Sequence, residues 1–143
     1  MYLLDTSVIS ELRKARAGKA DANVVTWAAN VVPESLFISA ITVEELEIGT
    51  LLVERRDPSQ GAVLRAWLDQ HVLPAFSDRI LAIDAAVARR SAALHVPDPR
   101  PIRDALIVAT ALVHRMTVVT RNTVDFQSTG VEIVNPWQGQ PER

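Results

Sequence analysis

Short apolar segments alternate with longer helical segments along the chain, and this alternation constrains the fold more than any other feature. Segments with the character of strands lie at residues 2–4, 36–39, 79–84, 116–120 and 131–134. Strands that are separated by helices need crossover connections, which produce a mostly parallel sheet covered on both faces. The sequence therefore predicts an α/β fold in which helices lie on both sides of a mostly parallel sheet.

Six helical segments are expected between these strands. They span residues 6–14, 23–31, 42 to about 56, 59 to about 76, 84 to about 95, and 103–115. Thr42 and Glu45 have the spacing of a capping box, so Thr42 is the expected N-cap of the third helix. Ser59 is expected to cap the fourth helix and Asp84 the fifth. The last helix is apolar nearly all round, which predicts that it is buried.

The length and composition indicate one globular domain over residues 1–143. Hydrophobic residues make up 48% of the chain and charged residues 22%, as expected of a protein with a core. Cysteine is absent, which excludes disulfides and Cys-ligated zinc. No apolar run is long enough to span a bilayer and no basic leader precedes the first one, so we expect a cytoplasmic protein without a membrane partner. The net charge of −2 is no nucleic-acid signature, and the basic run at residues 13–19 is either a solvated loop or a phosphate-contacting rim.

Acidic residues follow two of the expected strands, and another begins the buried helix. Ligands of such sheets bind beyond the carboxyl ends of the strands. Asp5 follows the first strand and is either a metal ligand or a helix N-cap, although Thr6 and Ser7 are also good caps. Asp104 begins the buried helix, where capping or an interaction with the helix dipole is the alternative role. Asp125 follows the fourth strand, where the alternative is a turn-forming residue.

Helical geometry separates Glu45 from the neighbouring glutamates. Glu45 shares a helix face with Ile41, Ile48, Gly49 and Leu52, whereas the other glutamates line a more polar stripe. A carboxylate in apolar surroundings is usually paired, protonated or bound to a metal, which favours a site role for Glu45 over the capping box. Gly49 on the same face is expected to permit a close approach by another element.

Four carboxylates at one edge of a sheet cannot all ionise unaided, because each raises the pKa of the others. A divalent cation resolves the repulsion, and all-oxygen ligation suits Mg²⁺ or Mn²⁺ better than zinc. Such ions activate water and neutralise charge on a phosphodiester. Thr120 and Asn122 are nearby polar groups that could orient a ligand or a water. His71, His95 and His114 match no metal-binding spacing and are expected to be structural or superficial.

Four segments in order resemble the PIN-domain ribonucleases, and most closely the VapC/FitB-type toxins of bacterial toxin–antitoxin pairs. They are LLDTSVISEL, ISAITVEELEIG, DALIVATALVHRMTVVTRNTVDF and TGVEIVNPW, and the likeness runs from Tyr2 to Trp137. The chain departs from the family in having Glu44 and Glu45 adjacent where one glutamate is usual. The register T-x-x-E-L selects Glu45, in agreement with the helical-face argument.

The resemblance implies a PIN-like three-layer α/β/α sandwich with a mostly parallel sheet of about five strands. It implies Mg²⁺- or Mn²⁺-dependent endonucleolytic cleavage of RNA, inhibition by a small cognate antitoxin, and usually a homodimer. The family's catalytic and metal-binding acids fall on Asp5, Glu45, Asp104 and Asp125. Its supporting polar positions fall on Thr6, Thr120 and Asn122. In this mechanism Asp5 and Asp104 hold the ion, and Glu45 helps directly or through water. Asp125 holds a second ion or orients the attacking water.

Two other functions are compatible with the sequence. The chain could act mainly with its antitoxin as a DNA-binding complex that has little nuclease activity, or it could be a metal nuclease that cleaves DNA. The acids act on phosphate chemistry common to both polymers, so only the resemblance favours RNA, with DNA contacted through the antitoxin complex. An antitoxin tail is expected to place an arginine against the carboxylates. Its hydrophobic residues are expected to contact exposed apolar side chains of this chain along residues 43–53 and 63–68, including Trp67.

Overall fold

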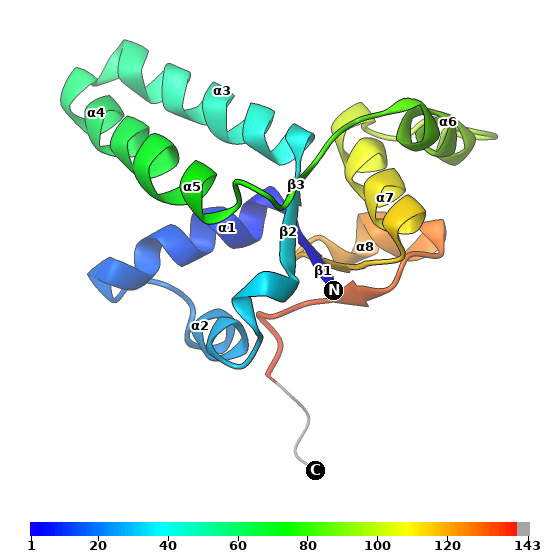
Figure 1. Ribbon diagram of the computed structural model, residues 1–143, viewed down its shortest axis with the longest axis horizontal. Helices are drawn as coiled ribbons and strands as arrows, with labels where there is room; N and C mark the ends of the chain where they lie inside the picture. The colour runs from blue at the N-terminus through cyan, green and yellow to red at the C-terminus, as the bar shows by residue number, and fades with distance from the viewer. Residues whose placement is uncertain (140–143) are drawn as a thin grey trace.

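A five-stranded parallel sheet forms the centre of the computed structural model, which describes residues 1–139. Its strands are β1 (Tyr2–Leu4), β2 (Leu36–Ser39), β3 (Ile80–Leu81), β4 (Thr117–Val119) and β5 (Ile133–Val134). The strand order is β3-β2-β1-β4-β5, and every neighbouring pair is parallel. The predicted parallel sheet of about five strands is therefore confirmed, and β1 is its central strand (Figure 1).

Helices and helical turns connect these strands. The α-helices are α1 (Thr6–Arg13), α2 (Ala22–Ala29), α3 (Ala40–Arg56), α4 (Pro58–Trp67), α5 (Leu73–Ala75), α6 (Ala85–Leu94), α7 (Ile102–His114) and α8 (Thr123–Phe126). The shorter turns are η1 (Lys14–Ala17), η2 (Pro33–Ser35), η3 (Leu68–Val72) and η4 (Gln127–Thr129). The segment after β4, expected to be a loop, thus contains two helical turns. The segment expected as one helix to about residue 76 is continued from α4 by a π-helical turn, η3.

Two of the three expected N-caps are wrong by a few residues. Helix α3 begins at Ala40 because Ser39 keeps an extended backbone and its Oγ accepts a hydrogen bond from Ile41 N at 3.0 Å. Thr42 is therefore not the cap but a fully buried residue of the first turn. Helix α4 is capped by Asp57, not Ser59, since Pro58 can take the first helical position. Residue Asp84 does cap α6, as expected.

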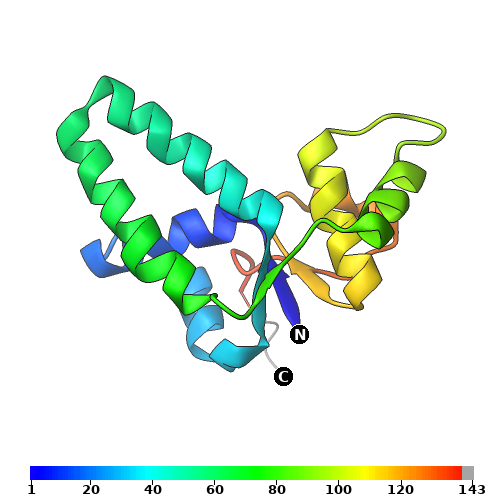
Figure 2. The same cartoon turned by 45° about the horizontal axis from the view of Figure 1, so that its top comes forward.

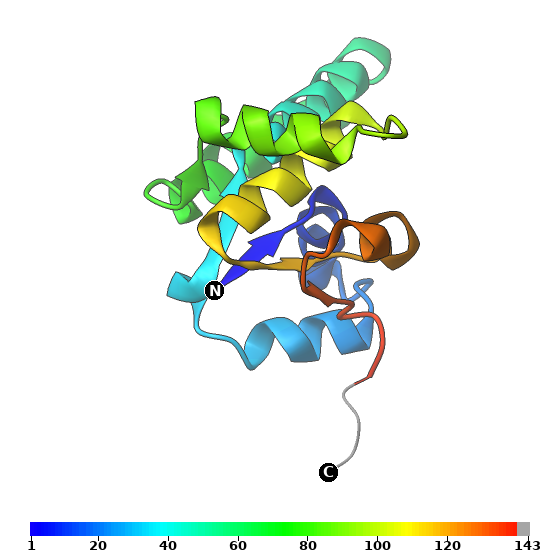
Figure 3. The same cartoon turned by 90° about the vertical axis from the view of Figure 1, so that its right-hand side faces the viewer.

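Alternate residues of the central strands point to two separate hydrophobic clusters. Leu4, Ile38 and Val119 face a cluster built with α1, α2, α3 and η3. Leu3 and Val118 face the opposite cluster, which is built with α7, α8 and Val131. Figure 3 shows β1 and β4 running between α7 on one side and α2 on the other. The three-layer arrangement is confirmed.

Helix α7 is largely buried, as its apolar sequence predicts. The run from Ile107 to Ala111 is inaccessible or nearly so, and it packs against α6 and β4. The first turn of α7 is different, because Ile102 and Arg103 are exposed and Asp104 is half-buried. The N-terminus of this helix therefore opens at the surface of the molecule, and not at the centre of the fold. In residues 1–139, no helix has the length and apolar character needed to cross a bilayer.

Helices α3 and α4 form a long hairpin that projects from the sheet (Figure 2). The two helices approach closely at Gly61, where a β-carbon would lie 2.4 Å from Glu54 Cα. The close approach expected at Gly49 is wrong, because nothing lies within 4 Å of the position a β-carbon would take there.

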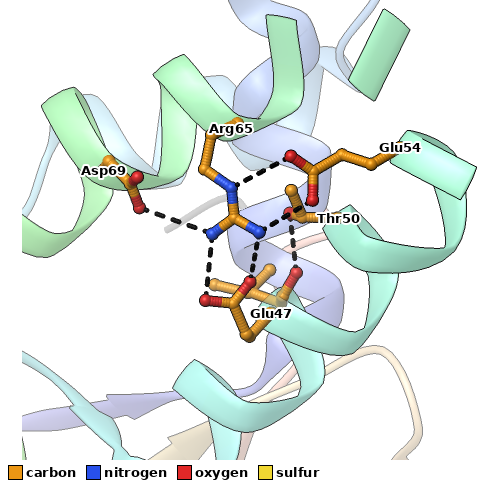
Figure 4. A network of polar contacts seen from close by, with 6 residues as sticks. Glu47, Thr50, Glu54, Arg65 and Asp69 are labelled. Carbon is orange, nitrogen blue, oxygen red and sulfur yellow. Dashed lines mark hydrogen bonds and ion pairs between the residues drawn. The ribbon is translucent and has the colours of Figure 1, made fainter. Parts of the chain in front are cut away.

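Arg65 of α4 ties the hairpin together through Glu47 and Glu54 of α3 and also lies near Asp69 (Figure 4). Its Nη1 donates to Glu47 Oε1 at 2.9 Å, and its Nη2 donates to Glu54 Oε1 at 2.9 Å. Nη1 also lies 3.7 Å from Asp69 Oδ1. Hydrogen bonds from Arg65 lower the pKa of both glutamates, and the glutamates raise the pKa of Arg65 above its usual range.

Candidate active site

The pairing of β1 with β4 brings Asp5 and Thr120 together. Leu4 is paired with Val119, so the next residue of each strand leaves the sheet at the same carboxyl-terminal edge. Asp5 N donates to Val119 O at 2.9 Å, and the buried Thr120 hydroxyl donates to Asp5 Oδ2 at 2.8 Å. The sheet register thus places residues that are far apart in sequence in direct contact.

Asp5 also takes the capping role that was its alternative. Its Oδ1 accepts a hydrogen bond from Thr6 N at 2.8 Å, and it is the N-cap of α1. Ser7 Oγ lies 3.3 Å from Asp5 Oδ2 as a further donor. These donors hold the Asp5 carboxylate in place at the end of the central strand.

Glu45 reaches the same edge from the first turns of α3. Its Oε1 accepts a hydrogen bond from the Thr6 hydroxyl at 2.7 Å, and its Oε2 lies 3.8 Å from Arg103 Nε. The expected apolar surroundings are wrong, because Ile48 and Leu52 on its helix face are exposed. The buried stripe of α3 is instead Thr42, Leu46 and Thr50. Contacts to polar groups, rather than burial, therefore orient Glu45.

Asp104 lies in the first turn of α7 and faces the other acids. Burial is the main cause that raises the pKa of Asp104, and the charges of Asp5, Glu45 and Asp125 raise it further. Arg103 opposes this shift. Within residues 1–139 the Asp104 carboxylate takes part in no hydrogen bond or ion pair. It is thus an acid in a repulsive field with its oxygens available to a ligand.

An open pocket of about 520 Å³ joins three of the four acids. Its lining residues are Asp5, Thr6, Ser7, Glu45, Asp104, Arg121 and Asn122. Asp125 is exposed and lines a neighbouring pocket of about 280 Å³, which shares Asp104 with the first. Asp125 Oδ2 accepts a hydrogen bond from Asn122 Nδ2 at 2.8 Å, while Asn122 N donates to Thr120 Oγ1 at 3.0 Å. The fourth acid is therefore linked to the site through Asn122.

Two arginines at this edge are absent from the set that the sequence singles out. Arg103 pairs with Glu45, and Arg121 lines the pocket directly after Thr120. Their positions carry a usable signal, since each is adjacent to a predicted site residue. Arginine is so common on surfaces that adjacency alone does not separate a site role from a solvated one.

The oxygens of this pocket suit a hard divalent cation in their chemistry. Among residues 1–139, no group of three or more His, Cys, Asp or Glu side chains is arranged to hold a metal ion as the side chains stand. Mg²⁺ nevertheless keeps several waters and is commonly bound through one or two carboxylates. A cation near Asp104 would relieve the repulsion that raises the pKa of this residue. The donor set therefore fits Mg²⁺ or Mn²⁺ with water completing its shell.

The fold and site together define an α/β/α protein whose candidate acids lie at the carboxyl edge of the central strands of a parallel sheet. The profile of the PIN domain matches residues 2–131. The chain belongs to the PIN domain family, as the resemblance of its four segments indicates.

Curated relatives and solved structures cover nearly the whole chain. VapC ribonuclease Y4jK of Sinorhizobium fredii is 36% identical over 143 residues, with 96% of this chain and 99% of the relative covered. Toxin FitB of Neisseria gonorrhoeae is 38% identical over 142 residues with the same coverage. A structure of FitAB bound to a DNA fragment has a TM-score of 0.87, 35% identity and full coverage of both chains. FitAcB from Neisseria gonorrhoeae has a TM-score of 0.84 and 37% identity, covering 96% of this chain and 99% of the other.

Proposed function

We propose that this protein is a metal-dependent endoribonuclease and the toxin of a type II toxin–antitoxin pair. The observation that carries the proposal is the unpaired carboxylate of Asp104, which faces Asp5 and Glu45 across an open pocket. Burial raises the pKa of Asp104, and the charges of these acids raise it further. A divalent cation bound beside Asp104 would relieve this repulsion, so the arrangement fits a metal site. Relatives named VapC ribonuclease and toxin FitB support the choice of RNA as substrate and the toxin role.

Asp5, Glu45 and Asp104 would hold Mg²⁺ or Mn²⁺, with Asp125 at the margin of the site. When bound, the ion supplies charge neutralisation at the phosphodiester and activates water. Thr120 holds the Asp5 carboxylate through the 2.8 Å hydrogen bond, and Thr6 holds Glu45 through the 2.7 Å hydrogen bond. Both hydroxyls are positioning groups and transfer no proton to the substrate.

Asp125 has a separate role in this proposal. Asn122 occupies its Oδ2, which leaves Oδ1 to accept a hydrogen bond from a water beside Asp104. An exposed carboxylate beside an open pocket can orient a water molecule, and it is better suited to this role than a fully enclosed carboxylate would be.

The proposed partner is a cognate antitoxin that binds the hairpin and the pocket together. Leu51, Leu52 and Val63 of the hairpin are more than half exposed and offer an apolar surface. Trp67, by contrast, is packed against the core and lies beneath the guanidinium of Arg13. An arginine of the antitoxin would pair with the pocket acids, as expected from their charge. We further propose a homodimer, with DNA bound only through the antitoxin complex, since the FitAB relative is solved on DNA.

A cleavage assay with matched substrates tests the enzymatic proposal. Structured RNA, unstructured RNA and DNA of the same sequence are incubated with Mg²⁺, with Mn²⁺ or with chelator. Wild type is compared with Asp5→Asn and Asp104→Asn, which keep side-chain size and remove charge. Asp78→Asn is the control, because the Asp78 side chain is 86% exposed and does not line the pocket.

The proposal expects cleavage of RNA that needs the metal and is lost in both site variants but not in the control. Activity in chelator, or full activity in both site variants, contradicts it. Preferential cleavage of DNA would favour the DNA-nuclease alternative. Absence of any cleavage, together with tight antitoxin-dependent binding to DNA, would favour the binding-subunit alternative.

A further inference from the structure

Arg121 is a cation at the mouth of an acidic pocket that does not pair with the acids. It directly follows Thr120, its side chain is exposed, and it lines the pocket with Asp5 and Asp104. In residues 1–139 it forms no ion pair. Its guanidinium instead lies 5.4 Å from the centroid of the Trp137 ring. Stacking on an aromatic ring therefore holds this side chain, and its five N–H donors are left for another partner.

Trp137 is a firm support for this stack. Its backbone N–H donates to Asn135 Oδ1 at 3.0 Å, and its backbone carbonyl accepts a hydrogen bond from Asn23 Nδ2 at 2.8 Å. The ring packs against the hydrophobic cluster on the α1 and α2 face of the sheet. A segment near the end of the chain is thereby fixed beside the carboxyl edge of β4.

The backbone of Arg121 is held as well. Thr120 N donates to Val134 O at 3.0 Å, and Thr123 N donates to Arg121 O at 3.0 Å. Asn122 N donates a hydrogen bond to the Thr120 hydroxyl oxygen, and that hydroxyl donates in turn to Asp5. Arg121 thus stands on the same rigid turn that positions the central carboxylate, and only its side-chain torsions remain adjustable.

Arg103 is the other arginine at the pocket, and its situation differs. It lies 3.8 Å from Glu45, so an acid of the site already neutralises part of its charge. A polyanion that approaches carboxylates is repelled by them, so it needs a nearby cation that is not already paired with those carboxylates. Arg121 meets this condition, and a planar guanidinium matches phosphate oxygens in a bidentate manner.

We propose that Arg121, stacked on Trp137, binds a backbone phosphate of the polynucleotide and positions it over the acids. This inference rests on the proposed function and names a substrate-binding residue for the same site. Trp137 is a positioning residue that acts only through Arg121. The pair contributes to binding of the substrate and not to the chemical step.

Binding and cleavage are measured separately, so that the two proposals can fail separately. Binding of a labelled single-stranded RNA is titrated in Mg²⁺ at several salt concentrations, in an Asp104→Asn background that does not cleave. The variants added are Arg121→Gln, Arg121→Lys, Trp137→Leu and Trp137→Phe. Arg56→Gln is the matched control, since eleven residues of α3 separate it from Glu45 and correspond to roughly 16 Å of helix rise. Steady-state cleavage is measured with the same substitutions in the wild-type background.

Arg121→Gln should weaken binding by about tenfold and reduce the salt slope by about 0.7, the value for one phosphate contact on a single strand. In cleavage, KM should rise by a similar factor while kcat changes by less than about twofold. Arg121→Lys should recover the salt slope but only part of the affinity, because lysine keeps the charge and lacks the fork. Trp137→Leu should weaken binding in the presence of Arg121 and add little to Arg121→Gln, whereas Trp137→Phe should retain most of the affinity.

Unchanged affinity and salt slope in Arg121→Gln would overturn the inference, as would an equal loss in Arg56→Gln. A fall in kcat at constant KM would also overturn it, because that pattern belongs to the chemical step. The inference is also refuted if the Asp104→Asn protein, with Arg121 intact, binds no polynucleotide. RNA binding that depends on Arg121 without cleavage by the wild type refutes the proposed nuclease function alone.

Discussion

Replacing Gly61 with alanine should force the α3–α4 hairpin apart. The added β-carbon would lie 2.4 Å from Glu54 Cα and 2.8 Å from Glu54 N. Non-bonded carbons normally approach to about 3.5 Å, so the helices must separate by about 1 Å at this point. Two of the three obstructing atoms belong to the backbone of α3, so a side-chain rotation cannot remove the clash. Arg65, which bridges the same two helices, would lose its geometry with Glu54.

The expected loss of stability is about 1–3 kcal/mol, the usual range for overpacking a tight contact. For a chain of this length each kcal/mol lowers Tm by about 4 °C. Gly49→Ala is the matched control, because Gly49 is also helical and nothing lies within 4 Å of the added carbon. That substitution should stabilise the protein by about 0.5–1 kcal/mol, since alanine favours the helix. The two variants should therefore differ by about 1.5–4 kcal/mol in opposite directions from wild type.

Urea unfolding and thermal melting of the two variants measure this difference directly. Binding of the antitoxin should weaken in Gly61→Ala and stay near wild type in Gly49→Ala, if the hairpin is the docking surface. Equal stability of the two variants would refute the reasoning, because it would mean that the helices do not approach closely at Gly61.

Three further outcomes follow from the contacts at the site and the hairpin. Asp104→Asn should make the metal-free protein more stable near neutral pH, because the raised pKa of Asp104 shows that its charge is disfavoured in the fold; melting without metal checks this, and a less stable variant contradicts it. The same variant should lose the rise in Tm that Mg²⁺ or Mn²⁺ causes in wild type. Thr120→Val keeps the side-chain shape but removes the hydroxyl that joins Asp5 to Asn122. We expect the free energy of unfolding to fall by about 1–3 kcal/mol and the cleavage rate to fall as well. An unchanged cleavage rate would show that Thr120 does not position the catalytic acids. Arg65→Gln should make the free energy of unfolding less dependent on pH on the acid side. In wild type the pKa of Glu47 lies below its ordinary value of 4.5, so the contribution of Glu47 to stability is present above that pH and is lost as the pH falls through the lowered pKa, whereas the variant has no such contribution to lose. Urea unfolding at a series of pH values checks this, and superimposable profiles for the two proteins would contradict it.

The periodicity of the chain was sufficient to predict the layers and most of the elements. The short apolar run Tyr2–Leu4 and the longer apolar run of α7 are local patterns, and burial acts on them directly. Ends of elements were predicted less well. Ser39, and not Thr42, caps α3 because β2 ends there, and no local pattern distinguishes two hydroxyl residues three positions apart that are both good caps.

The site shows the same division. Its candidate acids were found from their places after strands and at helix starts, and the structure brings Asp5, Glu45 and Asp104 to one pocket. The surroundings of Glu45 differ from those expected, because Ile48 and Leu52 on its side of α3 are exposed. Helical spacing shows which side chains share a face, but only the neighbouring elements determine whether that face is covered.

The order of residues along this chain determined its strands, its helices and the presence of oxygen ligands at their ends, because backbone preferences and hydrophobic periodicity act over a few positions. The tertiary structure alone decided which of these groups meet. Strand register set Thr120 against Asp5, a close helix crossing selected Gly61, and the return of the chain placed Trp137 beneath Arg121. These contacts join residues distant in sequence, and their energies depend on distance and burial in space, which no local pattern contains.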